Sequence, residues 1–381
     1  MIPYSTQFIN NNDKKNVLKV LNSKFLTTGP AIENFEKKLA KKFQCKYSVV
    51  VNSATSALHL ACLSLGLGKK DTFWTSPISF VSSANCALLC GSKIDFVDVD
   101  SKTFNISMEM LEKKFSNIKK KADLPKIIMP VHLSGNPCDM KKLKKLSRKY
   151  KFKIVEDASH ASGSKIGNNL VGSCKFSDVA VFSFHPVKTI TSGEGGAILT
   201  NSKKIYEKVK ILRNQGISKK TTKIKNSNIN PWHYEVNELG FNYRMTDLQA
   251  ALGSSQLDSL KKFILKRNKI AEYYKKKLSN KVHVQYVDRK NLSTYHLFII
   301  RVKSSIRNKI VKKLIQRKIV TSLHYIPIYR HKLYRKNFAS FSKDFPESES
   351  YYKEAISLPI FYKLSYKQLN NIIFIVNSFF K

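Results

Sequence analysis

The chain has 381 residues, of which 42% are hydrophobic and 11% aromatic, so it is long enough for two globular domains and is not a disordered protein. Lys and Arg number 68 against 26 acidic residues, which leaves a formal net charge of +42. Apolar runs are too short to span a membrane, and the first residues lack the pattern of a signal peptide, so we expect a cytoplasmic protein with no membrane partner.

The positive charge allows two interpretations. A basic surface is typical of a non-enzymatic DNA-binding or regulatory protein, because it releases counterions from phosphate backbones. However, only 10 of the 68 basic residues are Arg, and the Lys residues are spread along the whole chain. Proteins that read base edges favour Arg, and nucleic-acid-binding tails concentrate their charge in blocks. The pattern therefore favours a solvated lysine surface and no nucleic-acid partner.

The six cysteines form no CxxC pair, and several lie in apolar runs such as ANCALLC. This pattern predicts reduced, buried thiols rather than disulfides, and we expect no metal site.

The first half of the chain alternates short β-rich runs with helical runs. The strands are expected at 47–51, 72–76, 93–99, 126–133, 153–157, 178–184 and 195–200, and helices at 53–66, 80–91 and 139–151. This alternation predicts an α/β fold with a mostly parallel central sheet between helices. Ligands of such sheets bind beyond the carboxyl ends of the strands, so the residues that follow each strand are the candidates for a site.

The pattern changes near residue 247, where a long amphipathic helical region begins. A strand at 296–302 and helices at 306–318 and 366–379 follow. We therefore expect a large domain at 1–250 and a smaller C-terminal α/β domain at 251–381, joined by a rigid helix.

Two polar segments directly follow predicted strands. The segment NSATS, which contains Ala54 and Thr55, opens a helix, and its N–H groups could bind a phosphate or simply cap the helix. Asp157 ends the strand KIVED, where an unpaired buried carboxylate would be costly. Asp157 is therefore expected either in a structural salt bridge or as the partner of a protonated ring nitrogen.

A lysine follows a third strand. Lys188 lies in FSFHPVKTITSGEGG between two apolar strands, and Ser183 ends the strand before it. Partial burial lowers the pKa of a lysine and makes its amine nucleophilic. A phosphate site, a buried carboxylate and a nucleophilic lysine are together what pyridoxal 5′-phosphate (PLP) requires, and Phe80 could stack on its ring or belong to the core.

The segments NSATSALHLA, EDASHASG, FSFHPVKTITSGEGGAI and LGFNYRMTDLQAALG closely resemble the DegT/StrS-type sugar aminotransferases, which are PLP enzymes of aminotransferase fold type I. The resemblance covers essentially the whole chain. It implies that Lys188 binds the cofactor's aldehyde and moves protons during transfer. It also implies that Asp157 holds the pyridine nitrogen, and that the other cofactor contacts are Ala54, Thr55, Phe80, His160 and Ser183.

The resemblance also implies an obligate homodimer with shared active sites, in which Asn242 of FNYR reaches the cofactor phosphate of the neighbouring subunit. His324 and Tyr325, in LHYIPIY, are expected near the nucleotide sugar.

Finer features, such as FLTTGPAIENFE and AISLPIFYKLSYKQ, are similar to the family members of pseudaminic acid biosynthesis. They imply transfer from L-glutamate to C4 of UDP-2-acetamido-2,6-dideoxy-β-L-arabino-hex-4-ulose. A UDP-4-keto-pentose or GDP-4-keto-6-deoxymannose is the alternative acceptor.

Overall fold

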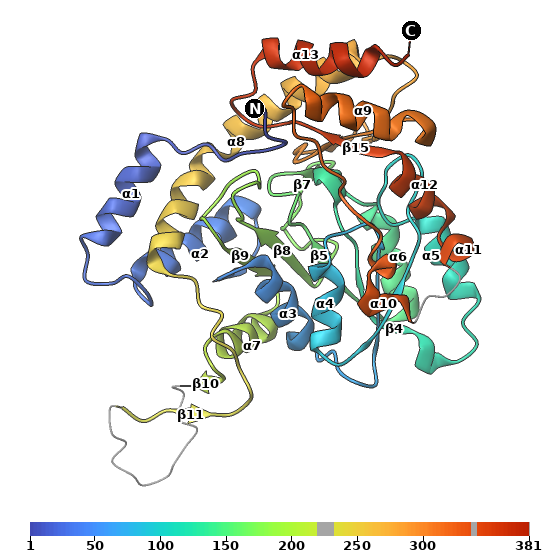
Figure 1. Cartoon of the computed structure of the whole chain (residues 1–381). Coiled ribbons are helices and arrows are strands. Elements are labelled where there is room, and N and C mark those ends of the chain that lie inside the picture. Colours follow the sequence, from blue (N-terminus) through green and yellow to red (C-terminus); the bar gives the residue numbers. More distant parts are fainter. Residues whose placement is uncertain (219–231, 337–340, 381) are drawn as a thin grey trace.

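The computed structural model describes residues 1–218, 232–336 and 341–380, and Figure 1 shows how they are arranged. Its main sheet has seven strands in the order β1-β9-β8-β5-β4-β2-β3. All neighbouring pairs are parallel except those that β9 makes with β1 and β8. The predicted α/β fold with a mostly parallel central sheet is thus confirmed. In chain order the strands are β1 (Tyr47–Val51), β2 (Thr72–Thr75), β3 (Lys93–Phe96), β4 (Pro125–Met129), β5 (Lys153–Asp157), β8 (Val179–Ser183) and β9 (Gly196–Thr200).

Helices cover both faces of this sheet (Figure 1). They bury its apolar side chains. One face packs against α3 (Ala54–Ser64), α4 (Ser82–Leu89) and α7 (Lys203–Arg213). The other face packs against α2 (Pro30–Phe43), α5 (Met108–Ser116), α6 (Met140–Tyr150) and the first half of α8 (Asp247–Lys277). Burial on both faces explains why the strands are nearly continuous runs of Val, Ile and Phe.

A second core forms around the other half of α8. It joins α9 (Ser304–Gln316) and α13 (Tyr366–Asn377) to a three-stranded sheet of β12 (His283–Val284), β14 (Phe298–Arg301) and β15 (Ala355–Leu358). Along α8, Ile264 still belongs to the first core and Ile270 to the second. The division at residue 250 stays a prediction, and the helix runs unbroken through it.

The remaining elements complete the described chain. The helices are α1 (Asn11–Leu21), α10 (Lys332–Arg335), α11 (Phe341–Asp344) and α12 (Pro346–Glu354), with single turns at Lys121–Asp123, Leu133–Gly135 and Ile328–Arg330. The strands are β6 (Lys165–Ile166), β7 (Asn169–Leu170), β10 (Ile217–Ser218), β11 (Glu235–Val236) and β13 (Asn291–Leu292).

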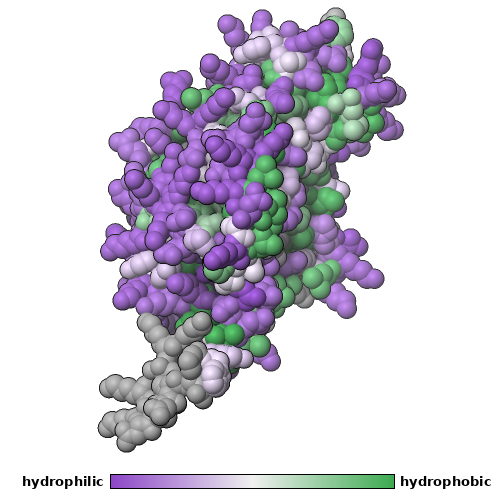
Figure 2. All heavy atoms as spheres, turned by 90° about the vertical axis from the view of Figure 1, so that its left-hand side faces the viewer, coloured by the Kyte–Doolittle hydropathy of each residue, from purple (hydrophilic) through white to green (hydrophobic). Residues whose placement is uncertain are grey.

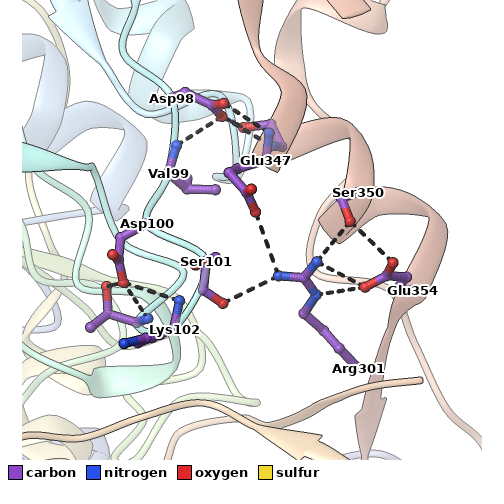
Figure 3. Close-up of polar contacts among 11 residues, drawn as sticks. Asp98, Val99, Asp100, Ser101, Lys102, Arg301, Glu347, Ser350 and Glu354 are labelled. Carbon is purple, nitrogen blue, oxygen red and sulfur yellow. Dashed lines mark hydrogen bonds and ion pairs between the residues drawn. The ribbon is translucent and has the colours of Figure 1, made fainter. Parts of the chain in front are cut away.

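Helix α12 is tied to the loop after β3, which lies about 250 residues earlier in the chain (Figure 3). Asp98 accepts hydrogen bonds from the backbone N–H groups of Glu347 and Ser348, each at 2.9 Å. These groups lack partners within the helix, so the carboxylate caps its positive end. Arg301 of β14 joins the same junction by donating to Glu354 at 3.0 Å and to the carbonyl of Ser101 at 3.2 Å.

Hydrophilic side chains dominate the face of the molecule drawn in Figure 2, and apolar side chains form smaller patches on it. Among the described residues, no helix is sufficiently long and apolar to cross a membrane. All six cysteines are free, as expected. Cys45 and Cys90 are only half-buried, which corrects the expectation that the thiols are buried.

Candidate functional site

A cavity of about 610 Å³ lies at the carboxyl ends of β1, β5 and β8. Opposite the sheet it is closed by His296, two residues before β14, and by residues 322–325 of the loop after α9. Nine of the ten site residues expected from the sequence line it: Ala54, Thr55, Phe80, Asp157, His160, Ser183, Lys188, His324 and Tyr325.

The first turn of α3 forms the floor of an anion site. Ser53 caps the helix by accepting a hydrogen bond from the Ser56 N–H at 3.1 Å. The N–H groups of Ala54 and Thr55 have no hydrogen-bond partner in the described part of the chain, and such groups bind anions well. A Cβ atom on Gly196 would lie 2.6 Å from the carbonyl oxygen of Ser53. Glycine is therefore required for β9 to approach this turn.

Asp157 is buried at the end of β5, with 5% of its surface exposed. Its Oδ2 accepts a hydrogen bond from the Ser83 hydroxyl at 2.6 Å, and its Oδ1 accepts one from the Ser159 N–H at 3.1 Å. No cation of the described chain forms an ion pair with it. The structural salt bridge, one of the two alternatives for Asp157, is therefore absent from the described part of the chain. The carboxylate is oriented by its two hydrogen bonds and can pair with a cationic ligand.

Lys188 lies in the segment between β8 and β9, and Ser183 ends β8 beside it. Burial lowers the pKa of Lys188 to about 8, although the Asp157 carboxylate opposes this shift. An amine with this pKa is partly neutral at physiological pH and can act as a nucleophile or a base.

His160 is buried between two hydrogen bonds that assign its tautomer. Its Nδ1 accepts from the Ser134 N–H at 3.2 Å, so the proton of the neutral ring is on Nε2. Nε2 lies 3.1 Å from the Tyr325 hydroxyl oxygen and therefore donates to it. Burial and the nearby Lys188 hold the pKa of His160 well below its ordinary value. The ring is thus neutral, and the proton of Tyr325 remains available to a ligand.

His324 and Tyr325 close the cavity on the side of the second core. Nδ1 of His324 lies 2.8 Å from the Ser357 hydroxyl of β15. The buried Tyr351 of α12 donates to the His324 carbonyl at 2.5 Å. Burial lowers the pKa of His324 to about 4. Phe80 is 56% exposed, and its ring centroid lies 6.0 Å from that of Tyr325, so its ring is free to stack on a ligand.

Sequence reasoning missed three groups. Ser83 and Ser134 orient Asp157 and His160, respectively, and no local pattern marks them. His296 lines the cavity beside His160 with 4.4 Å between ring centroids, and its Nδ1 is buried without a hydrogen-bond partner among the described residues. His296 lies two residues before β14, at the first position of the strand expected at 296–302.

Asn242 is the one expected site residue that does not line the cavity. It is exposed, and its backbone carbonyl accepts a hydrogen bond from the Asn52 amide at 3.5 Å. Its predicted contact lies in a neighbouring subunit, so its role stays a prediction.

The profile of the DegT/DnrJ/EryC1/StrS aminotransferase family matches residues 7–377 of this chain. A relative from Campylobacter jejuni strain 81-176, UDP-4-amino-4,6-dideoxy-N-acetyl-beta-L-altrosamine transaminase, is 34% identical over 96% of this chain and 94% of its own length. GDP-perosamine synthase from Escherichia coli O157:H7 is 33% identical over 100% of this chain and 98% of its own.

Two solved structures extend the likeness to the fold. PseC from Helicobacter pylori, an aminotransferase involved in the biosynthesis of pseudoaminic acid, superposes with a TM-score of 0.89 at 33% identity, covering 99% of this chain and 98% of its own. Spr1654 from Streptococcus pneumoniae, in its PLP-form, superposes with a TM-score of 0.89 at 27% identity, covering 99% of this chain and 98% of its own.

Proposed function

This chain belongs to the DegT/DnrJ/EryC1/StrS aminotransferase family, and within that family we propose that it transfers the amino group of L-glutamate to UDP-2-acetamido-2,6-dideoxy-β-L-arabino-hex-4-ulose. It is a nucleotide-sugar 4-aminotransferase, and its cofactor is PLP. The convergence of Lys188, Asp157 and the first turn of α3 on one cavity carries the proposal. The similarity to the Campylobacter and Helicobacter enzymes supports the choice of sugar.

The residues present fit this cofactor. The free N–H groups of Ala54 and Thr55, together with Ser183, would hold the phosphate, and Asp157 would pair with the ring nitrogen. Because Gly196 has no side chain beside Ser53, the first turn of α3 stays open to the phosphate. When bound, PLP supplies an electron sink that stabilises negative charge on the reacting carbon.

Each residue of the site has a separate role in the transfer. With PLP bound, Lys188 Nζ, with its lowered pKa, would bind the aldehyde and would then move the proton to and from the carbon that carries the amino group. Asp157 would keep the ring nitrogen protonated, and its own orientation is held by Ser83 and Ser159. His160 orients Tyr325 so that the hydroxyl donates into the cavity, toward the nucleotide sugar together with His324.

A homodimer with shared sites is part of the proposal. Apolar side chains are exposed on both sides of the FNYR segment: Leu18, Leu21, Phe25 and Leu26 near α1, and Trp232, Tyr234, Val236 and Leu239 around β11. Thr27, next to the first group, bridges to Thr246 after FNYR. Exposed Asn242 thus lies between apolar surfaces of the kind that subunit contacts bury.

Mixing an inactive Lys188→Ala protein with an impaired Asn242→Asp protein tests the shared site. Lys188→Ala and Asn242→Asp proteins should form hybrid dimers in which one site carries both lesions and the other carries neither, so activity should partly recover. If subunit exchange is confirmed by mass and no activity returns, Asn242 does not act across subunits.

The activity itself is tested with purified protein, PLP and L-glutamate. The absorbance of the bound cofactor should change with glutamate alone, and single-turnover rates should be highest with the UDP-linked 4-keto-6-deoxy sugar. The similarity to GDP-perosamine synthase favours GDP-4-keto-6-deoxymannose as the second candidate, with a UDP-4-keto-pentose as a further comparison. A faster turnover of either would overturn the proposed acceptor.

A further inference from the structure

His296 is a rigidly held part of the cavity wall to which the proposed transfer assigns no role. Its surface is 2% exposed, and its ring packs beside that of His160 with 4.4 Å between centroids. Its backbone is held on both sides, because its N–H donates to the Ser134 carbonyl at 2.8 Å and its carbonyl accepts from Arg267 at 3.1 Å. The ring therefore has a fixed position in the cavity wall.

The ring of His296 lacks the hydrogen bonds that hold the other two buried imidazoles of the cavity. His160 bonds through both ring nitrogens, and Nδ1 of His324 lies 2.8 Å from the Ser357 hydroxyl. Nδ1 of His296 is enclosed by protein and has no partner among the described residues. A proton on Nδ1 would be a buried, unsatisfied donor, which is costly. The neutral ring therefore carries its proton on Nε2, at the edge left to face the cavity, where the N–H can donate to a ligand.

The surroundings of His296 are positively charged. Burial holds its pKa well below the ordinary value, and the nearby cations of Lys188 and Arg267 lower it further, so the ring is neutral at physiological pH. Arg267 is 3% exposed and donates to three backbone carbonyls, and no acidic residue of the described chain pairs with it. Burial lowers the pKa of Arg267 only to about 10, so it stays charged. A ligand that accepts from His296 is therefore favoured if it is an anion.

We propose, on the basis of the function above, that His296 binds the α-carboxylate of the amino donor through its Nε2–H group. This carboxylate is bonded directly to the carbon that reacts beside Lys188, whereas the diphosphate of the nucleotide sugar is attached at C1, across the hexose ring from C4. No arginine of the described chain lines the cavity, so this wall lacks the usual bidentate partner of a carboxylate. His296 is thus a binding residue that determines specificity for an amino acid as donor.

Three substitutions of His296 test the contact and the edge of the ring that makes it. His296→Phe keeps a ring without a donor and should raise the dissociation constant of L-glutamate about 10- to 100-fold, because a hydrogen bond to a charged group is lost. The amide of His296→Gln can replace Nε2–H and should restore most of the affinity, whereas the shorter amide of His296→Asn corresponds to Nδ1 and should not. Titration of the absorbance of the bound cofactor measures the constants. The exposed His283→Phe is the matched control.

A second ligand separates the carboxylate from the rest of the donor. 4-Aminobutyrate is glutamate without its α-carboxylate, so the wild type and His296→Phe should bind it equally weakly. The affinity for the nucleotide sugar should change far less than that for glutamate. An equal loss for both amines, a larger loss for the nucleotide sugar, or tighter glutamate binding by His296→Asn than by His296→Gln would overturn the assignment.

The same titrations distinguish this inference from the proposed function. If the cofactor absorbance of the wild type does not respond to glutamate, the proposed amino donor is wrong, and the role of His296 is refuted with it. If the wild type responds and His296→Phe binds glutamate with unchanged affinity, only the role of His296 is refuted. Circular dichroism and the dissociation constant of PLP should match the wild type in the Gln and Asn variants, which keep a polar side chain in the wall.

Discussion

The two walls of the cavity are held in place in different ways. The sheet wall consists of Ala54, Asp157, Ser183 and Lys188, each within five residues of a strand end. The opposite wall contains His324 and Tyr325, which lie in no long helix or strand and are held by distant partners. The sheet wall is therefore positioned by local geometry, whereas the opposite wall depends on how the two cores meet.

Helix α12 shows how the opposite wall is held. Asp98, from the sheet side, caps the helix (Figure 3). Tyr351 of the same helix donates to the His324 carbonyl. His160, also from the sheet side, contacts the Tyr325 hydroxyl. The comparison predicts that lesions in the sheet wall stop the chemistry, whereas lesions behind the opposite wall weaken the binding of the sugar.

The largest effect is expected for Lys188→Ala. Turnover should fall by about 10⁴-fold or more, because the same amine binds the aldehyde and moves the proton. This loss of turnover is measured as the rate of product formation from glutamate and the nucleotide sugar. Lys153→Ala is the matched control, since Lys153 lies at the other end of β5 and pairs with Asp178 at the surface. A substantial residual rate in Lys188→Ala would refute its role.

Asp157→Asn should leave the fold intact and lower kcat by about 10²- to 10³-fold, because the ring nitrogen loses the charge that keeps it protonated. Ser83→Ala should have a smaller effect, since it removes only one hydrogen bond to the carboxylate. Circular dichroism tests whether the variants are folded, and steady-state kinetics measures their kcat. An unchanged kcat in Asp157→Asn would make this residue merely structural.

The two walls should also differ in pH dependence. Below about pH 8 the neutral fraction of Lys188 falls about tenfold per pH unit, because burial lowers its pKa only to that value. The rate at which apoprotein captures PLP covalently, measured by mass after borohydride reduction, should fall in step. His160 and His324 should add no inflection near pH 6.5, because both are already neutral there. An inflection that disappears in His324→Asn would show that the opposite wall titrates.

The smallest effect is expected for Tyr351→Phe, which removes the hydrogen bond to the His324 carbonyl. One such bond contributes about 0.5–1.5 kcal/mol, so KM for the nucleotide sugar should rise about two- to tenfold with little change in kcat. The exposed Tyr366→Phe serves as control. Equal losses in kcat and in affinity would mean that α12 supports the whole cavity rather than its sugar side.

Part of the site was predictable because the ends of buried strands can be recognised in the sequence. A buried parallel strand is a short apolar run, and the first polar residue after it must lie at the edge of the sheet, so Asp157 and the segment with Lys188 could be located from the sequence. The family resemblance placed His324 and Tyr325 near the sugar, and both line the cavity. Ser83, Ser134 and His296 carry no such signal, because their partners are Asp157 and His160, 26 to 136 residues away along the chain.

The sequence by itself determined the class of fold and the cofactor, and it predicted the amine that would bind this cofactor, because hydrophobic periodicity and strand-end chemistry are local properties of the chain. Tertiary structure alone decided the tautomer of His160 and the anchoring of the opposite wall. These depend on burial and on contacts between residues far apart in the chain, such as Asp98 with Ser348, which exist only once both cores have packed together.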